Sequence, residues 1–198
     1  WMLGSRDTDG FQPIFNGLDL TGWSGPIDNY LVEQGTVRCK AGAGGTIYTD
    51  KEYADFEARL EFRLPPGGNN GLAIRYPGKG DTAYVGMCEL QVLDNTAAKY
   101  AGLKEYQFHG SVYGQKAAHR GFHRPVGEWN FQQVRVQGSR ITVELNGTVI
   151  LDQDISEIEK PPSGHEHPGR TRTSGHFGFA GHNDPVAYRA VQIRELPS

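Results

Sequence analysis

Three residues in one short segment carry the side chains that acid–base chemistry needs. Glu89 and Gln91 are two positions apart, and Asp94 follows three positions later. In a β-strand, residues two positions apart project from the same face, so Glu89 and Gln91 are expected to be neighbours. A bulge after Gln91 would bring Asp94 to that face as well. The segment therefore predicts a polar row on one face of a sheet, with two carboxyl groups in it.

Two carboxyl groups on one face suit the cleavage of a glycosidic bond, where one acts as acid and the other as base or nucleophile. The spacing Glu89-x-Gln91-x-x-Asp94 resembles the Glu-x-Asp-x-x-Glu signature of laminarinase- and lichenase-type glycosidases. Here the middle acid is an amide and the last acid is shorter, so the retaining mechanism of those enzymes does not carry over. A polar row on a solvated sheet is the alternative interpretation.

A second segment offers space and a positive charge. If it is a strand, Gly71, Ala73 and Arg75 share one face of it. The two small residues would leave room above the sheet for a ligand. Arginine can hydrogen-bond sugar hydroxyls or orient a carboxylate, so Arg75 is a candidate substrate-binding residue. A structural ion pair between Arg75 and Glu89 is the alternative.

A histidine completes the set of candidate acid–base groups. In the segment from His176 to His182, the residues His176, Ala180 and His182 would share a face. The pKa of histidine lies near neutrality, so His182 close to a carboxylate could act as general base or general acid. A hydrogen-bonded structural histidine is the alternative.

The chain also contains a long segment, residues 95–128, without a regular pattern. Long loops in a compact domain are usually functional or mobile. We therefore expect this segment to form a wall of the site and to bring Lys104, Tyr106 or His109 close to Glu89.

The elements that must position these residues are β-strands. Apolar and charged residues alternate over Phe56–Leu64, which is typical of a sheet with one buried and one solvated face. Asn146-Gly147 between two alternating runs predicts a hairpin with a type I′ turn. Roughly a dozen short strands with turn signals between them predict a sandwich. Further strands are expected at Tyr30–Glu33, Thr36–Cys39, Thr46–Thr49, Gly71–Tyr76, Met87–Leu93, Asn130–Val136, His176–Ala180 and Ala187–Arg194, and a short one near Ser111–Tyr113.

The predicted fold class is therefore all-β, a concanavalin-like jelly-roll sandwich of two antiparallel sheets in a single domain over residues 1–198. The chain has 198 residues, a formal charge of −3, 27 glycines and 11 prolines. It has no basic patch of the size that nucleic acid requires. It also lacks the ~20 consecutive apolar residues of a membrane span. The first nine residues form a short polar segment, so no signal peptide is expected in this chain.

Two cysteines and a pair of histidines are candidates for a disulfide or a metal site. Cys39 and Cys88 could form a disulfide between neighbouring strands, but two buried thiols are the favoured interpretation. Without a Cys-x-x-Cys pattern, a zinc–thiolate site is not expected. His165 and His167 are interpreted as part of an exposed loop. No metal or cofactor is predicted; a structural calcium is compatible with such a fold, but no Asp-rich loop demands one.

Several short motifs occur along the chain in a characteristic order. They are Phe11–Trp23, Asn69-Asn70-Gly71 with Arg75, Glu89-x-Gln91-x-x-Asp94, Gly127–Asn130, Leu145-Asn146-Gly147 and Gly178-x-x-x-His182-x-Asp184-Pro185-Val186. Together they resemble the 3-keto-disaccharide hydrolase domain family from about Phe11 to Leu196. The resemblance implies a concanavalin-like sandwich, a secreted or periplasmic location and a carbohydrate partner. Its expected substrate is a glycoside whose sugar ring is oxidised at carbon 3.

A ketone at carbon 3 acidifies the hydrogen at carbon 2. A base can then remove that proton and expel the glycosidic oxygen, and water can add to the resulting enone. Glu89 or His182 is the candidate base, and Asp94 or His109 the candidate acid. Direct hydrolysis by Glu89 and Asp94 is the alternative within the same class.

Other polar residues are candidates for binding the substrate. Arg75 or Lys104 would stabilise the developing enolate oxygen. Gln91, Tyr106, His109 and Tyr113 are further substrate-binding candidates.

A non-catalytic carbohydrate-binding module is the competing hypothesis, because many sandwiches of this type only bind sugars. It would use Tyr48, Tyr84, Tyr106 or Tyr113 to stack on sugar rings. A structural or adhesion domain is a third possibility. Carboxylates in a pocket favour the enzyme, an open aromatic strip favours the module, and a flat solvated face favours the third.

Overall fold

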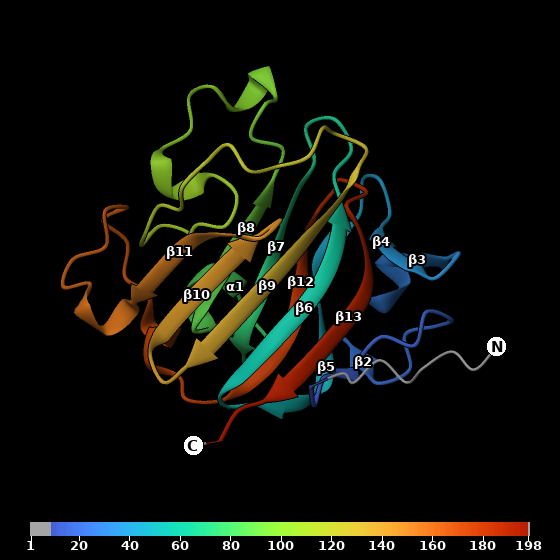
Figure 1. Ribbon diagram of the computed structural model, residues 1–198, viewed down its shortest axis with the longest axis horizontal. Helices are drawn as coiled ribbons and strands as arrows, with labels where there is room; N and C mark the ends of the chain where they lie inside the picture. The colour runs from blue at the N-terminus through green and yellow to red at the C-terminus, as the bar shows by residue number, and fades with distance from the viewer. Residues whose placement is uncertain (1–8, 198) are drawn as a thin grey trace.

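The structure describes residues 9–197, which form two antiparallel β-sheets packed face to face and the loops that connect their strands (Figure 1). In this computed structural model the larger sheet has eight strands in the order β11-β10-β9-β6-β13-β4-β3, with β1 paired to β13. The smaller sheet has the order β2-β5-β12-β7-β8. The predicted all-β sandwich is confirmed. Most of the polar start of the chain, residues 1–8, lies outside the described residues.

The strands follow the alternating segments of the sequence closely. They are β1 (Gln12–Pro13), β2 (Trp23–Ser24), β3 (Tyr30–Glu33), β4 (Thr36–Cys39), β5 (Gly44–Tyr53), β6 (Phe56–Arg63), β7 (Asn69–Tyr76), β8 (Cys88–Leu93), β9 (Trp129–Gln137), β10 (Arg140–Leu145), β11 (Thr148–Asp154), β12 (Gly175–His182) and β13 (Ala187–Glu195). One short α-helix, α1 (Thr82–Val85), lies between β7 and β8, and the other helical turns among the described residues are 3-10 helices at Ile27–Asn29, Ala98–Tyr100, Glu105–Gln107, Ile155–Glu157 and Pro168–Thr171. In place of the short strand expected near Ser111–Tyr113 there is an isolated bridge between Leu90 and Val112. Among the described residues, no helix is long and apolar enough to cross a membrane.

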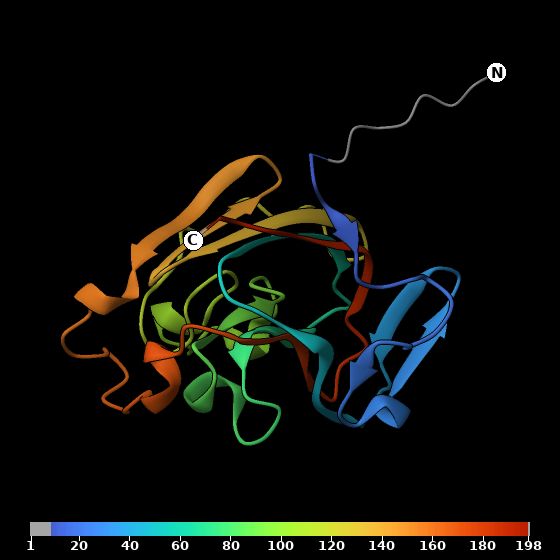
Figure 2. The ribbon, with the colours of Figure 1, turned by 90° about the horizontal axis from the view of Figure 1, so that it is seen from below.

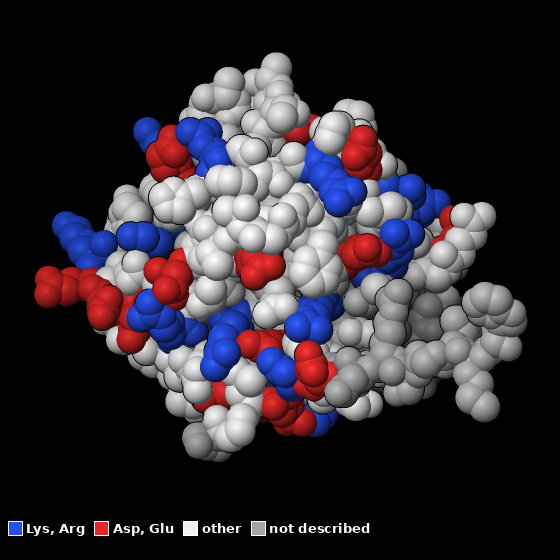
Figure 3. Space-filling model, in the orientation of Figure 1, with Lys and Arg blue, Asp and Glu red and all other residues white. Residues whose placement is uncertain are grey.

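Strand β6 shows how the alternation builds the larger sheet. Its apolar residues face the smaller sheet and are fully buried, as at Phe56 and Phe62. On the other face, Glu57 contacts Arg135 at 3.1 Å, and Glu61 is paired with an arginine of β13. Figure 3 shows this outer face with positive and negative side chains interspersed. The sheet therefore has one dry face for the core and one charged face for solvent.

The hairpin between β10 and β11 has the predicted turn. Leu145 pairs with Thr148, and the two loop residues Asn146 and Gly147 have φ angles of 49° and 87°. Positive φ at both central positions is the type I′ conformation that Asn-Gly favours.

Aromatic side chains fill the space between the two sheets. Trp23 stacks on Phe179 with ring centroids 5.3 Å apart, and Phe179 stacks on Tyr188 at 4.0 Å. The hydroxyl of the buried Tyr188 donates a hydrogen bond of 2.8 Å to Asn70 of β7. This stack spans both sheets and therefore fixes β12 and β7 against β13.

Cys39 and Cys88 are both buried free thiols. The favoured interpretation is thus confirmed, and they form no disulfide. Cys39 lies in β4 of the larger sheet and Cys88 in β8 of the smaller one. Burial raises the pKa of both thiols, which keeps them protonated.

The long segment 95–128 connects the edge strand β8 to β9 of the other sheet, passing β11 on the way (Figure 1). Its backbone pairs with the free edge of β8: the N–H of Tyr113 donates to the carbonyl of Glu89 at 3.0 Å. The N–H of Gln91 donates to the carbonyl of Ser111 at 3.1 Å. The segment is thereby held beside the polar face of β8. Figure 2 shows the two layers from the side, with β9–β11 above and the part of the chain around α1 below.

Candidate functional site

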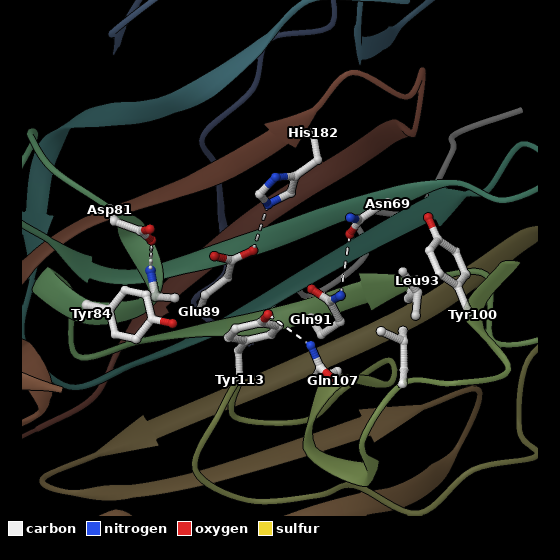
Figure 4. A pocket seen from close by; sticks show the side chains of 12 residues that line it. Asn69, Asp81, Tyr84, Glu89, Gln91, Leu93, Tyr100, Gln107, Tyr113 and His182 are labelled. Carbon is white, nitrogen blue, oxygen red and sulfur yellow. Dashed lines mark hydrogen bonds and ion pairs between the residues drawn. The ribbon is translucent and has the colours of Figure 1, made fainter. Parts of the chain in front are cut away.

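A polar pocket of about 280 Å³ lies on the outer face of the smaller sheet (Figure 4). Strands β7, β8 and β12 form its floor, the connection around α1 forms one wall, and the segment 95–128 forms the other. The lining residues are Asn69, Asp81, Ala83, Tyr84, Glu89, Gln91, Leu93, Tyr100, Leu103, Gln107, Tyr113 and His182. Four of the nine residues predicted for the site, Glu89, Gln91, Tyr113 and His182, are therefore brought together here.

A carboxylate–histidine pair occupies the floor of the pocket. Nε2 of His182 is 3.2 Å from Oε1 of Glu89. The side chain of Glu89 is only 6% exposed, whereas that of His182 is 46% exposed. The second carboxylate oxygen of Glu89, Oε2, has no hydrogen-bond partner among residues 9–197. One oxygen of the carboxylate is thus fixed by the histidine, and the other is free to meet a ligand.

The glycine at position 71 makes this pairing possible. Glu89 and His182 belong to β8 and β12, and β7 runs between these two strands. The Glu89 side chain crosses β7 over Gly71: a Cβ atom there would lie 2.0 Å from Oε1 of Glu89 and 2.5 Å from its Cδ. The room that the sequence predicted for a ligand above Gly71 is therefore occupied by the carboxylate of Glu89.

The environment of His182 favours its protonated form. The hydrogen bond to Glu89 is the largest cause that raises the pKa of His182; partial burial opposes it, and the charge of Glu89 adds to the rise. The contact with Glu89 therefore shifts His182 towards the imidazolium form. The pair can therefore offer an acceptor oxygen and an acidic N–H at one place.

Amide side chains continue the floor beyond Glu89. Gln91 projects from the same face of β8, and its Nε2 donates to Oδ1 of Asn69 at 3.4 Å. The core side of these strands carries Leu72, Cys88 and Leu90, which are completely buried. The predicted alternation of β8 is confirmed, and it presents a carboxylate and an amide to the same pocket.

The wall around α1 carries Asp81 and Tyr84. Asp81 caps α1 by accepting a hydrogen bond of 3.1 Å from the N–H of Ala83. Behind this wall, Nδ1 of His167 lies 2.9 Å from the carbonyl oxygen of Ala83, and its ring is 5.0 Å from that of Tyr84. His167 is only 3% exposed, so the prediction of an exposed loop is wrong at this residue. The loop that contains His167 instead packs against the wall around α1 at this residue.

The opposite wall comes from the segment 95–128, as predicted, through residues that are mostly different from those expected. Nε2 of Gln107 donates to the hydroxyl of Tyr113 at 3.1 Å. The hydroxyl of Tyr100 donates to the carbonyl of Gly67 at 2.9 Å. These bonds fix two phenol rings at the rim of the pocket. No described residue accepts the proton of the Tyr113 hydroxyl, so this proton can be donated to a ligand.

Arg75 does not project into the pocket, contrary to the prediction. Its backbone has a φ of 48°, a left-handed conformation that interrupts the alternation of β7. The guanidinium is 1% exposed and contacts Asp55 at 2.8 Å. It also donates to the carbonyl of Gly138 at 2.8 Å and that of Arg172 at 2.9 Å. Arg75 ties the turns at one end of the sandwich together, and it forms no ion pair with Glu89.

Asp94 lies at the end of β8, outside the pocket lining. It accepts hydrogen bonds from the N–H of Gly67 at 2.8 Å and from the hydroxyl of Thr96 at 2.6 Å. Burial alone would raise the pKa of Asp94, but these hydrogen bonds outweigh it and lower the pKa. An ionised, fully occupied carboxylate is poorly suited to act as an acid, and the expected bulge does not bring it to Glu89.

The three remaining candidates also lie outside the pocket lining. His109 is buried between the sheets against Phe62; it accepts from the N–H of Leu93 at 3.3 Å, and Nε2 lies 2.8 Å from Gln132. Burial lowers the pKa of His109 well below its usual value, so it is a neutral core residue. Lys104 is exposed and Tyr106 half-buried.

The residues that the sequence analysis missed come mainly from loops. Asn69 and Leu93 are exceptions, because they lie in β7 and β8 with the same alternation as Gly71 and Gln91 and could have been found in that way. Asp81 precedes α1 as an N-cap, which is a weak signal in so short a helix. Nothing in the pattern around Tyr100 or Gln107 marks them as pocket residues. Among residues 9–197 no group of three or more His, Cys, Asp or Glu side chains could hold a metal ion.

The two-sheet topology gives the chain a lectin-like jelly-roll fold, which solved structures share. Residues 10–194 match the 3-keto-alpha-glucoside-1,2-lyase-like domain, and the chain belongs to this family. The family predicted from the sequence is thus confirmed.

Known relatives agree with this assignment. The chain is 25% identical to a 3-keto-disaccharide hydrolase of Bacteroides thetaiotaomicron, over 96% of the chain and 80% of the relative. A crystal structure of a candidate glycosyl hydrolase from Parabacteroides distasonis is 26% identical, with a TM-score of 0.80 over 94% of this chain and 99% of that one. The carbohydrate-binding module CBM66 of Bacillus subtilis shares the fold, at 13% identity and a TM-score of 0.57 over 88% and 96% of the two chains. The relatives support a glycoside hydrolase-like role and a sugar partner.

Substitution of Gly71 tests the geometry of the pair. In Gly71→Ala, the added methyl group would occupy the place of Glu89 Oε1, and we expect the flexible carboxylate to move away from His182. Because the hydrogen bond raises the pKa of His182, that pKa should fall towards the ordinary histidine value. The measurement is an NMR titration of the His182 imidazole.

The matched control is Gly102→Ala, since a Cβ at Gly102 has no atom within 4 Å. This variant should titrate like the unmodified protein. An unchanged His182 pKa in Gly71→Ala would show that the contact across β7 does not set the state of the histidine.

Proposed function

We propose that this protein cleaves 3-keto-glycosides by elimination across carbons 1 and 2, with Glu89 as the base. The observation that carries the proposal is the free Oε2 of a buried carboxylate at the floor of a sugar-sized polar pocket. Membership of a family described as 3-keto-alpha-glucoside-1,2-lyase-like supports this reaction over direct hydrolysis. Direct hydrolysis would need a second catalytic carboxyl group: Asp94 lies outside the pocket lining, and Asp81, which does line the pocket, accepts the capping hydrogen bond of α1.

The residues of the pocket can carry each step. Glu89 removes the proton from carbon 2, and the electrons form an enolate with the oxygen on carbon 3. The C1–O bond then breaks, which leaves an enone and an alkoxide, and His182 donates the proton that makes this leaving group an alcohol. The hydroxyl of Tyr113 is a donor for the enolate oxygen in place of Arg75 and Lys104, because Gln107 already fills one of its acceptor positions. Addition of water to the enone would complete the hydrolysis.

The alternative of a carbohydrate-binding module is less well supported by the shape of the site. The pocket has a carboxylate–histidine pair on its floor rather than an open aromatic strip. Tyr84 and Tyr113 are part of its walls, and Tyr106 does not line it. The secreted or periplasmic location that the family implies stays a proposal.

Replacement of Glu89 is the direct test of the base. Glu89→Gln should lower turnover of a 3-keto-α-glucoside by about 10²–10⁴-fold, because an amide cannot accept the proton. The change is nearly isosteric, so the fold should persist and circular dichroism should be unchanged. Turnover is measured on a panel of 3-keto-α-glucosides beside their unoxidised parents.

The same change at Glu105 is the control, since that carboxylate is 67% exposed and lies outside the pocket lining. Glu105→Gln should retain full activity. Full activity in Glu89→Gln would transfer the role of base to His182, and equal turnover of the unoxidised parents would exclude a mechanism that needs the ketone.

The pH dependence separates the two possible bases. If Glu89 is the base and protonated His182 the acid, kcat/KM should fall as the pH rises through the raised pKa of His182. If neutral His182 were the base, kcat/KM would rise over the same pH range. A pH–rate profile measured from pH 5 to 9, with the histidine titration on the same sample, decides between these signs.

A further inference from the structure

A separate pocket of about 420 Å³ lies between the end of β7, the turn from β9 to β10 and the residues that precede β12. It shares no lining residue with the pocket around Glu89. Three arginines line it, Arg75, Arg170 and Arg172, and no Asp or Glu is among its described lining residues. The walls of this pocket therefore carry positive charge and no negative charge of their own.

The guanidinium of Arg75 belongs to the floor of this pocket. It donates to the carbonyl oxygens of Gly138 and Arg172 and lies 3.3 Å from the sulfur of Met87, and all three partners line the pocket. Burial lowers the pKa of Arg75, and the charge of Asp55 opposes this effect without cancelling it. The single ion pair with Asp55 thus compensates the buried positive charge only in part.

The other two arginines have donors to spare. Nη1 of Arg170 donates to the carbonyl of Ile158 at 2.8 Å, and Nε of Arg172 donates to the carbonyl of Arg75 at 3.0 Å. Both side chains are half-buried, and the remaining N–H groups of the two guanidinia have no partner among residues 9–197. Each guanidinium is therefore held in place with several donors unused.

Hydroxyl groups complete the polar lining. Ser139 donates to Ser156 at 3.4 Å, and Ser156 donates to Asp154, outside the lining, at 2.6 Å. The hydroxyls of Thr171 and Thr173 have no hydrogen-bond partner among residues 9–197. Two guanidinia and two threonine hydroxyls are thus available to an acceptor in this pocket.

The segment that carries these donors is fixed at both ends. The turn Pro168–Thr171 packs so closely against α1 that a Cβ atom at Gly169 would overlap the carbonyl oxygen of Val85. At the start of β12, a Cβ atom at Gly175 would overlap the backbone of Arg75. Fixed donors reduce the ordering that binding a ligand would require.

We propose that this pocket binds a tetrahedral oxyanion, phosphate or sulfate, either as the free ion or as the ester group of a sugar. Guanidinium groups form charge-assisted, often bidentate hydrogen bonds to such oxygens. Arg170, Arg172 and the two threonine hydroxyls would donate to the oxyanion above the positive floor that Arg75 provides. Donors from several residues suit oxygens that point in several directions better than the two oxygens of a planar carboxylate. The site is independent of the reaction proposed for Glu89.

An NMR titration of the isotope-labelled protein tests this site. In a phosphate-free buffer at constant ionic strength, inorganic phosphate and inorganic sulfate should shift the Nε–H signals of Arg170 and Arg172 until they saturate. Acetate and chloride should bind more weakly than either. Glucose 6-phosphate and glucose distinguish the two sources of the oxyanion: tighter binding of the ester than of phosphate indicates a sugar ester, and equal or weaker binding indicates the free ion.

Substitutions assign the binding to this pocket. Arg170→Gln and Arg172→Gln should each weaken phosphate binding by about tenfold, because each removes charge-assisted hydrogen bonds. Thr173→Val removes one neutral donor at an exposed position and should weaken binding by about threefold. The matched control is Arg38→Gln, which removes the same charge from an arginine outside this pocket and should bind phosphate like the unmodified protein.

The inference is overturned if phosphate and sulfate shift these signals no more than chloride does at the same ionic strength. It is also overturned if acetate binds as tightly as phosphate, or if Arg38→Gln weakens binding as much as the pocket variants do. The amide spectrum of each variant reports whether it folds. Should both glutamine variants fail to fold, Thr173→Val decides, and an unchanged phosphate affinity in that variant would contradict the site.

Discussion

Glu89 and His182 belong to strands separated by β7, and their hydrogen bond crosses the backbone of that strand at Gly71. Any side chain at position 71 would occupy the place of the carboxylate. The pair therefore depends on the strand order β12-β7-β8 and on a missing side chain in its middle strand. From this contact follow the raised pKa of His182 and the free second oxygen of Glu89.

The sandwich keeps this pair in a defined environment from below and from the sides. The stack of Trp23, Phe179 and Tyr188 fixes the strands beneath the pocket. On one side, the ring of His167 contacts the carbonyl oxygen of Ala83 and so supports the wall that carries Asp81 and Tyr84. On the other, main-chain hydrogen bonds attach the segment 95–128 to the edge of β8. Residues far apart in the sequence are thus preorganised around one carboxylate, which reduces the ordering that a bound sugar would require.

Period-two alternation was sufficient to predict most of the fold and the floor of the site, because it depends only on which side chains face the core. It predicted that Glu89 and Gln91 share a face. It failed at Arg75, where a left-handed residue in β7 redirects the side chain to the end of the sandwich. His109 and Asp94 were misjudged because burial and local hydrogen bonds, which a spacing does not show, turned them into structural groups. The pocket walls come from loops, whose side chains follow no period.

The central claim is that the pocket removes a proton from carbon 2 of an oxidised sugar ring. The most direct measurement follows a 3-keto-α-glucoside that carries deuterium at carbon 2 during turnover in ordinary water, with Glu89→Gln as the background for spontaneous exchange. Elimination predicts that the deuterium appears in the solvent as the glycosidic bond breaks, and that the variant releases it only at the spontaneous rate. Complete turnover with the deuterium still at carbon 2 would contradict elimination and would indicate direct hydrolysis.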